Sequence, residues 1–281
     1  MLTHNKVSFF DKRIIELYLS IIAAITTVVS SIVIFVDIPT EYKLTFGLCL
    51  LGLLVIVYLI IWLWSNNLNK IDINVAGSMV TIKVGDIFKE KGLKVIAFNE
   101  YFDTQVDDVI ISKLSLNGIF LANHLGGDIG ELDKYISQYS FGKSEILGDN
   151  GARINGKNRR YQLGTICVYG EYLMTAFAKF DENNRAQLTM PEYLEFLINF
   201  WDKINSVYAQ KDVCTTIFGS GITRIKGHKN IEDEDLLKIM LWTFRISEMS
   251  FKYPARLTIV VHRDKINRIN LLDIRAARNG V

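Results

Sequence analysis

Two long uncharged apolar runs near the start of the chain limit its fold more than any other feature. The first covers Leu17–Val36 and the second Leu44–Trp64, and neither contains Asp, Glu, Lys, Arg or His. About 20 apolar helical residues cross the hydrocarbon core of a bilayer, so each run has the length of one transmembrane helix. Pro39, in the connector between the runs, prevents one continuous helix. The sequence therefore predicts a two-span helical hairpin.

A cleaved signal peptide is the competing interpretation of the first run, but that run is too long and a second follows directly. Three basic residues precede the first run, whereas the connector has only Lys43. Because basic residues concentrate on the cytoplasmic side, we expect an inner-membrane protein with both termini in the cytoplasm. The expected parts are a cytoplasmic segment, 1–16, the hairpin, 17–64, and a soluble part, 65–281.

Composition and charge disfavour several function classes. The net charge is only +2 and no long basic run is present, so no nucleic acid partner is expected. The three cysteines are widely spaced among apolar residues, which gives neither a zinc motif nor a disulfide framework. The four histidines show no metal-ligand spacing, so no metal is expected. Because the apolar runs carry no charge, we expect them to anchor the chain in lipid or self-associate rather than transport ions.

From Ser65 onward the chain alternates strand-like and helix-like segments. Short apolar runs predict strands, and apolar residues at helical spacing predict helices that cover them. This alternation favours an α/β fold with a largely parallel or mixed sheet flanked by helices. Strands are expected over residues 78–84, 93–98, 165–168, 173–180, 213–218 and 257–261, and long helices over 191–210 and 232–246.

Three of the predicted strands end in residues suited to ligand binding. Ligands on such sheets bind beyond the carboxyl ends of the strands. Gly85–Ile87 follows the first strand, Asn99 the second, and a glycine-containing segment, Gly219–Arg224, a later one. A P-loop ending at Ser144 is excluded because Ser137 stands at the place of its first glycine. Gly219–Arg224 also lacks the third glycine of a dinucleotide fingerprint.

In their order and spacing these segments resemble a macro domain, the fold that binds ADP-ribose, from roughly Ile71 to the C-terminus. In that family the Asp of the early Gly-Asp-Ile accepts a hydrogen bond from the adenine amino group. The late glycine loop wraps the diphosphate with backbone N–H groups, which glycine permits through close approach. The resemblance implies a ligand site made of Asp86, Ile87, Asn99, Ser115, Asn117, Gly118, Gly219, Ser220, Gly221, Ile222, Thr223 and Arg224.

Plainer interpretations stay open for each group. Asp86 could instead cap a helix, Gly219–Gly221 could be a turn between a strand and a helix, and Arg224 could be a solvated loop residue. A structural membrane adaptor that binds no nucleotide is therefore one alternative function.

The segment after the second strand departs from hydrolytic macro domains, which usually show asparagine-alanine-alanine-asparagine there. Here Asn99 is the only counterpart, because Glu100, Tyr101 and Phe102 follow it. We therefore expect a binding protein without enzymatic activity and without a cofactor. The alternative is a membrane-tethered ADP-ribose hydrolase, for which Glu100 and Asp103 are the nearby acids.

Three segments behind a two-span hairpin resemble one subfamily, the membrane-anchored macro-domain effectors of bacterial Thoeris antiphage defence. These segments are Asn99–Thr104, Ser115–Gly118 and Gly219–Arg224. The resemblance implies a sensor for an ADP-ribose-derived signal made by a partner TIR-domain enzyme. It also implies that signal binding assembles a homo-oligomer of the spans in membrane lipid and disrupts the membrane.

Overall fold

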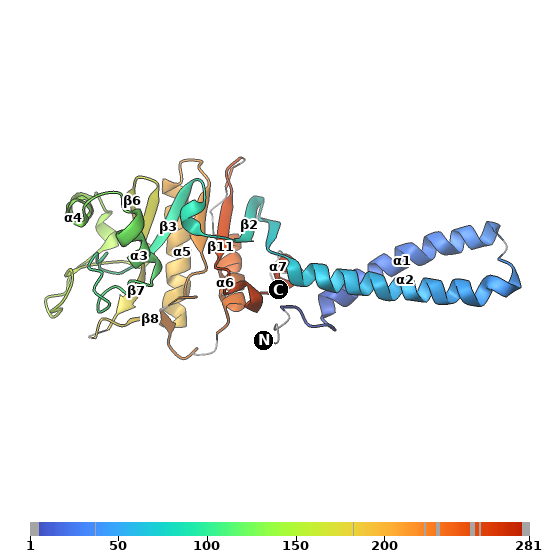
Figure 1. Cartoon of the computed structure of the whole chain (residues 1–281). Helices are drawn as coiled ribbons and strands as arrows, with labels where there is room; N and C mark the ends of the chain where they lie inside the picture. Colours follow the sequence, from blue (N-terminus) through green and yellow to red (C-terminus); the bar gives the residue numbers. More distant parts are fainter. Residues whose placement is uncertain are drawn as a thin grey trace.

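The structure is a computed structural model of the chain, and it joins an α/β domain to a long helical hairpin that projects from one side (Figure 1). It describes residues 6–36, 38–181, 183–221, 223–228, 231–247, 251–252 and 254–276. The predicted combination of a hairpin and an α/β domain is confirmed.

The hairpin consists of α1 (Lys12–Phe35) and α2 (Thr40–Asn67). Both helices are long and apolar enough to cross a membrane, with mean hydropathy values of 2.3 and 2.8 over their apolar windows. Within these windows 0% and 6% of the residues are buried, which is unlike the core helix of a soluble protein. Pro39 directly precedes α2, which agrees with its predicted role as a helix breaker between the two runs.

One mixed sheet holds nine strands among the described residues, in the order β1-β2-β11-β9-β3-β7-β8-β10, with β6 paired to β7. Strands β2, β11, β9, β3 and β7 run parallel to one another. Strand β1 runs antiparallel to β2, and β6 and β8 run antiparallel to β7, whereas β10 runs parallel to β8. The strands are β1 (Lys70–Val75), β2 (Ser78–Val84), β3 (Leu93–Asn99), β6 (Ile166–Tyr169), β7 (Tyr172–Phe180), β8 (Ala186–Leu188), β9 (Val213–Thr216), β10 (Arg224–Ile225) and β11 (Leu257–Val261).

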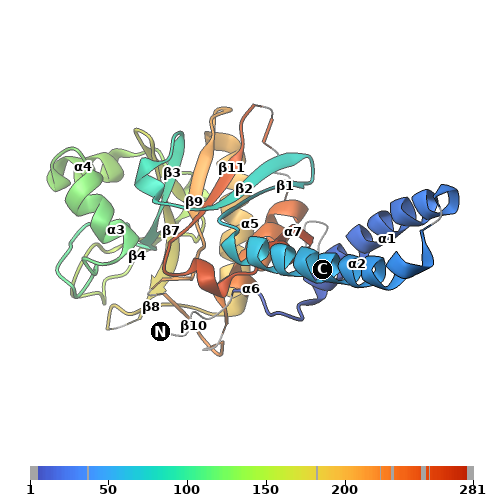
Figure 2. The same cartoon turned by 45° about the vertical axis from the view of Figure 1, so that its right-hand side comes forward.

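Two hydrophobic cores lie against the sheet. The larger core joins the sheet to α5 (Met190–Val207), α6 (Asp233–Ile246) and α7 (Leu271–Ala276), and its centre is aromatic. Phe218, for example, packs edge-on against Phe196 and Phe200 of α5. The smaller core joins β3 and β7 to α3 (Leu116–Ile119) and α4 (Ile129–Gln138). Helices cover both faces (Figure 2), as the sequence predicts.

Short elements complete the domain. They are the 3-10 turns η1 (Ile87–Lys89), η3 (Lys143–Glu145) and η4 (Ile266–Arg268), the π-helical turn η2 (Phe120–His124), and a separate two-stranded ribbon of β4 (Ile146–Asp149) and β5 (Arg159–Tyr161).

Some predicted boundaries differ from the observed ones. Strands 78–84 and 257–261 match β2 and β11, but the predicted strand 213–218 ends at Thr216. Ile217 and Phe218 leave the sheet because their side chains enter the larger core, where the Tyr193 hydroxyl donates to the Phe218 carbonyl at 3.0 Å. Strand β1 is not among the predicted strands, although its residues alternate between exposed and buried.

The parallel pairing sets where a ligand site can form. The carboxyl ends of β2, β9 and β3 meet at one edge of the sheet, so Asp86, Asn99 and the segment after β9 share that edge. Strands β9 and β10 follow each other in the chain, but β3, β7 and β8 lie between them in the sheet. The glycine loop, Gly219–Arg224, therefore connects strands that lie on opposite sides of β3.

A capping box at the start of α5 should make the domain's stability depend on pH. Glu192 Oε2 accepts hydrogen bonds from Thr189 N at 2.6 Å and Thr189 Oγ1 at 2.9 Å, and Lys179 Nζ donates to Oε1 at 2.8 Å. Burial opposes ionisation, but the Lys179 and Thr189 hydrogen bonds outweigh it and lower the pKa of Glu192 to about 2. Because the folded pKa is depressed, this stabilisation is present above pH 4.5 and is lost as the pH falls toward 2.

We therefore expect Glu192→Ala to lower the free energy of unfolding by about 1 kcal/mol at neutral pH, since a helix cap is lost. The difference from the parent should shrink as the pH falls through the window just given. Thermal unfolding of the detergent-solubilised chain, followed by circular dichroism, measures both effects. Glu195→Ala, at an exposed position of the same helix, is the control. Equal melting temperatures for the two variants would contradict the prediction.

Candidate functional site

Asp86 lies just beyond the carboxyl end of β2, at the edge of the sheet that gathers the predicted site. Gly85 N donates to the Val261 carbonyl at 3.1 Å, which fixes the chain as it leaves β2. Asp86 Oδ1 accepts from Phe88 N at 3.1 Å and caps η1, while Ile87 is buried. The helix-capping interpretation of Asp86 is thus observed. The Asp86 side chain is nevertheless exposed, so its carboxylate also faces solvent.

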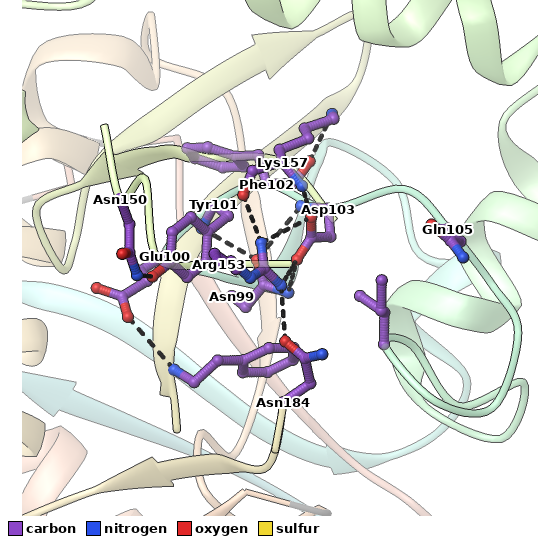
Figure 3. Close-up of polar contacts among 12 residues, drawn as sticks. Asn99, Glu100, Tyr101, Phe102, Asp103, Gln105, Asn150, Arg153, Lys157 and Asn184 are labelled. Atoms are coloured by element: carbon purple, nitrogen blue, oxygen red, sulfur yellow. Dashed lines mark hydrogen bonds and ion pairs between the residues drawn. The ribbon is translucent and has the colours of Figure 1, made fainter. Parts of the chain in front are cut away.

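Asn99, at the end of β3, is buried, and both ends of its side-chain amide have partners within its own turn (Figure 3). Its Oδ1 accepts from Tyr101 N at 3.0 Å and Asp103 N at 3.3 Å. Its Nδ2 donates to Asp103 Oδ2 at 2.9 Å. The Asn99 side chain therefore shapes the turn that leaves β3.

A buried ion pair between Asp103 and Arg153 forms the centre of this turn. The guanidinium binds both carboxylate oxygens, with N–O distances of 3.1 and 2.6 Å, and the two side chains are 1% and 6% exposed. Arg153 also lies over the Tyr101 ring, 3.9 Å from its centroid. Burial of charge is costly unless the charge is paired and hydrogen-bonded, and both conditions are met.

Gly156 lets a second loop approach the same carboxylate. Lys157 N donates to Asp103 Oδ1 at 2.8 Å. Gly156 has φ +89°, and a Cβ at this position would lie 2.7 Å from Asp103 Oδ1. Only glycine adopts this conformation readily and leaves room for the contact. The loop of Arg153 and Lys157 is therefore fixed on Asp103, which lies 50 and 54 residues earlier in the chain.

A pocket of about 500 Å³ opens beside this turn. Lys157 Nζ forms an ion pair with Asp133 Oδ1 at 2.6 Å and donates to the Phe102 carbonyl at 2.7 Å. Thr104 Oγ1 donates to the same Asp133 oxygen at 2.6 Å. The lining residues are Asp103, Thr104, Gln105, Val106, Ile129, Asp133, Gly156 and Lys157.

Glu100 is the second buried acid near Asn99. Its carboxylate accepts from Phe180 N at 3.3 Å and lies 3.8 Å from Arg160 Nε. Burial raises the pKa of Glu100, and the Phe180 hydrogen bond and the charge of Arg160 only partly offset that effect. Both acids that the sequence analysis named for a hydrolase are thus buried and have partners.

Ser115, Asn117 and Gly118 form the start of α3, which packs against β3. Ser115 Oγ accepts from Gly118 N at 3.1 Å and donates to Asn117 Oδ1 at 2.6 Å. A Cβ at Gly118 would lie 2.2 Å from the Ser112 carbonyl oxygen, so the packing of the turn requires glycine. This predicted loop therefore lies next to the end of β3.

The glycine loop has a fixed start and an open middle. Gly219 has φ +82°, and a Cβ there would lie 3.4 Å from Leu236 Cδ1 of α6. Ser220 N donates to the Ile217 carbonyl at 3.3 Å, which makes a turn. Around a Cβ at Gly221, by contrast, the described residues leave open space. Thr223 is half-buried, Arg224 begins β10, and Ile222 and the Arg224 side chain lie outside the described residues.

The structure brings Asp86, Asn99 and the described start of the glycine loop to one sheet edge, and it adds residues that were not predicted. Arg153, Lys157 and Asp133 are the main additions, and Asp103 entered only as an acid for the alternative hydrolase. A signal was present in the two glycines and two basic residues of Gly151–Lys157, but its partner lies fifty residues earlier. Sequence spacing does not reveal such a contact.

Comparison with known proteins gives a consistent result. The sequence profile described as Thoeris protein ThsA, macro domain, matches residues 80–262. Thoeris protein ThsA of Bacillus amyloliquefaciens (strain Y2) is 40% identical over 276 residues, which cover 96% of this chain and 92% of that protein.

Solved macrodomain structures are also similar. A mutant of the Oceanobacillus iheyensis macrodomain has a TM-score of 0.45 and 13% identity, covering 76% of this chain and all of that one. A second mutant of that macrodomain, with ADPR, has a TM-score of 0.45 and 11% identity, covering 74% and 96% of the two chains.

Removal of one partner of the buried Asp103–Arg153 ion pair should destabilise the domain strongly. We expect Asp103→Ala to lower the free energy of unfolding by about 3–5 kcal/mol, because Arg153 would stay buried without a counter-charge. Asp149→Ala removes the acid of an exposed Asp–Arg pair, with Arg159, and should change stability by less than about 1 kcal/mol. Chemical denaturation of both variants compares the two pairs directly. A similar, small effect for both would show that the buried pair does not hold the turn.

Proposed function

This chain belongs to the family of Thoeris protein ThsA, and we propose that it is a ligand-gated membrane effector of antiphage defence. In this proposal the macro domain binds an ADP-ribose-derived signal made by a partner TIR-domain enzyme. The hairpin then assembles with other copies in the inner membrane, with both termini in the cytoplasm, and disrupts the membrane.

The observation that carries the ligand part of the proposal is the shared edge of the parallel strands. Asp86 at the end of β2 and the open Gly221 after β9 both lie at the carboxyl edge, where α/β sheets bind ligands. Backbone N–H groups of a glycine loop bind phosphate without a dedicated side chain, which suits a diphosphate. The exposed Asp86 carboxylate suits an amino-group donor such as adenine.

The polar contacts around Asn99 favour binding over hydrolysis. A hydrolase needs an amide or carboxylate that is free to orient a water molecule. The Asn99 amide and the Asp103 carboxylate instead have their hydrogen bonds inside the turn. The observation that favours a hydrolase is Glu100, whose raised pKa would suit a general acid. Removal of ADP-ribose from a modified protein by the parent chain, and not by Glu100→Gln, would establish that alternative.

The membrane part of the proposal rests on the hairpin's surface. Only 0% and 6% of the residues in its apolar windows are buried, and no charged residue lies within 17–36 or 44–64. Apolar helices exposed along their length require lipid or another apolar surface. Two such helices cannot line a polar pathway by themselves, so membrane disruption requires several copies.

Two substitutions of Asp86 separate its capping contact from adenine binding. Asp86→Asn keeps a side-chain oxygen for Phe88 N but loses the charge, whereas Asp86→Ala loses both. We expect both variants to bind ADP-ribose about tenfold more weakly or worse, since a charge-assisted hydrogen bond contributes about 1.5–3 kcal/mol. Calorimetry on the full chain in detergent measures the affinity. Parent-like affinity for Asp86→Asn would reject the adenine assignment.

Gly221→Glu should abolish both ligand binding and ligand-dependent leakage. The substitution fits the fold, because a Cβ there meets open space among the described residues and no positive φ is required. Its carboxylate would occupy the phosphate position and repel a diphosphate. We expect the parent chain, reconstituted in lipid vesicles, to release an entrapped dye when ADP-ribose or its signal derivative is added. Gly221→Glu should release none above background.

Gly151→Glu is the matched control, since this glycine also has open surroundings and no positive φ but lies in the β4–β5 loop. It should bind and leak like the parent. Unchanged binding by Gly221→Glu would mean that the glycine loop is only a turn. Binding without leakage by the parent would instead remove the membrane part of the proposal.

A further inference from the structure

Six polar residues form a cluster where the hairpin meets the domain. They come from the start of α1, from α6, and from α7 with the residue before it, and we call them the base cluster: Asp11, Arg13, Glu234, Lys238, Asn270 and Asp273. Figures 1 and 2 both show α7 at the point where the hairpin joins the domain, with α6 beyond it.

Two contacts join α1 to the α7 segment. Arg13 Nε donates to Asp273 Oδ1 at 3.2 Å, and Asn270 Nδ2 donates to Asp11 Oδ2 at 3.1 Å. Asp11 is also the N-cap of α1, since its Oδ1 accepts from Arg13 N. The first turn of the first hairpin helix is therefore bound to α7 at two points.

Two contacts join the α7 segment to α6, and a third, between Lys238 and Glu234, lies within α6. Lys238 Nζ donates to Asp273 Oδ2 at 2.6 Å and to Glu234 Oε1 at 2.8 Å, while Asn270 N donates to Glu234 Oε2 at 2.6 Å. Burial opposes ionisation of Asp273, but the hydrogen bonds from Lys238 and Arg13 outweigh it and lower its pKa. The Asp273 carboxylate thus binds one cation from the domain and one from the hairpin.

Helix α6 also contacts the glycine loop on another face. Leu236 Cδ1 lies 3.4 Å from the Cβ position of Gly219, and Phe218 N donates to Met240 Sδ at 3.4 Å. Residues three and four apart share a helix face, so Glu234 and Lys238 share one face and Leu236 and Met240 another. A displacement of the loop therefore acts on α6, the helix whose Lys238 binds Asp273 of α7.

Apolar packing closes the junction on the hairpin side. Leu272 of α7 is buried together with Val7, Ile14 and Ile61. Only Leu68 and Asn69 separate the end of α2 from strand β1. The base of the hairpin is thus packed on the domain, and small shifts of α6 and α7 pass to it through direct contacts.

We propose that the base cluster couples the glycine loop to the hairpin, through the path Leu236–Lys238–Asp273–Arg13. This inference rests on the proposed function, in which a ligand at the loop controls assembly of the hairpin. A ligand shifts such an equilibrium only if it favours one arrangement of a shared element, and α6 is that element. Asp273 is a positioning residue that acts through Arg13 and Lys238.

The first test uses the full chain in lipid vesicles with ADP-ribose as the probe. Asp273→Asn keeps the shape of the side chain but removes the charge that two cations share. We expect ADP-ribose affinity within about twofold of the parent and ligand-dependent leakage reduced about fivefold or more, the range of typical coupling. Arg13→Gln should also reduce leakage, and the double variant should lose no more than Asp273→Asn alone, because both substitutions break the same Arg13–Asp273 contact.

Lys12→Gln is the matched control: it removes a neighbouring positive charge of α1 whose ion pair, with Glu16 at 3.9 Å, stays within that helix. It should leak like the parent. Parent-like leakage by Asp273→Asn would overturn the inference, and so would leakage without ligand, because the cluster would then restrain the hairpin rather than transmit to it. Absence of ADP-ribose binding by the parent would count against the proposed function instead.

A second test needs no ligand, so it shows whether the loop and the hairpin are coupled even if the parent does not bind ADP-ribose. Gly219→Ala adds a side chain at a position with φ +82°, which strains the backbone of the loop where it contacts Leu236 of α6. We expect hydrogen exchange of the first-turn amides of α1, including Ile15 N, to change about threefold or more in this variant. The change should vanish when Asp273→Asn is also present. An equal change in both backgrounds, or none in either, would overturn the coupling.

Discussion

Strand β3 hydrogen-bonds in parallel to β9 on one side and to β7 on the other, and six of its seven residues are buried. A parallel strand in this position needs both faces covered, and the two hydrophobic cores supply that cover. Strands β2, β9 and β3 run parallel, so their carboxyl ends lie at the same edge of the sheet. The turn after β2, the turn after β3 and the glycine loop therefore lie along that edge. The layout of the candidate site follows from this pairing, and the individual side chains refine it.

The turn after β3 shows how the domain uses charge inside its fold. Asp103, Arg153 and Asn99 are buried together, so each must have partners there rather than in water. Of the three, Asp103 lines the pocket together with Lys157 and Asp133. Their side-chain hydrogen bonds are therefore made inside the turn.

The sequence was sufficient wherever a signal lay within one continuous segment. The structure confirms four such local patterns: the uncharged runs that end at Val36 and Trp64, and the strands Ser78–Val84 and Leu257–Val261. Asp86 was predicted as a ligand contact with capping as its alternative, and its cap on η1 is observed. The predicted strand to Phe218 was too long, because burial of Phe218 under α5 overrides its strand propensity.

The sequence by itself determined that this chain has two apolar helices, an alternating α/β domain and a glycine loop after a late strand. Each of these depends on residues close together in the chain, where hydropathy and backbone preference act directly. Only the tertiary structure decided that Asp103 pairs with Arg153 and that Asp273 joins Arg13 to Lys238. These partners are fifty and 260 residues apart, so the packing of distant elements against one another, rather than their spacing in the sequence, brings them within hydrogen-bonding distance.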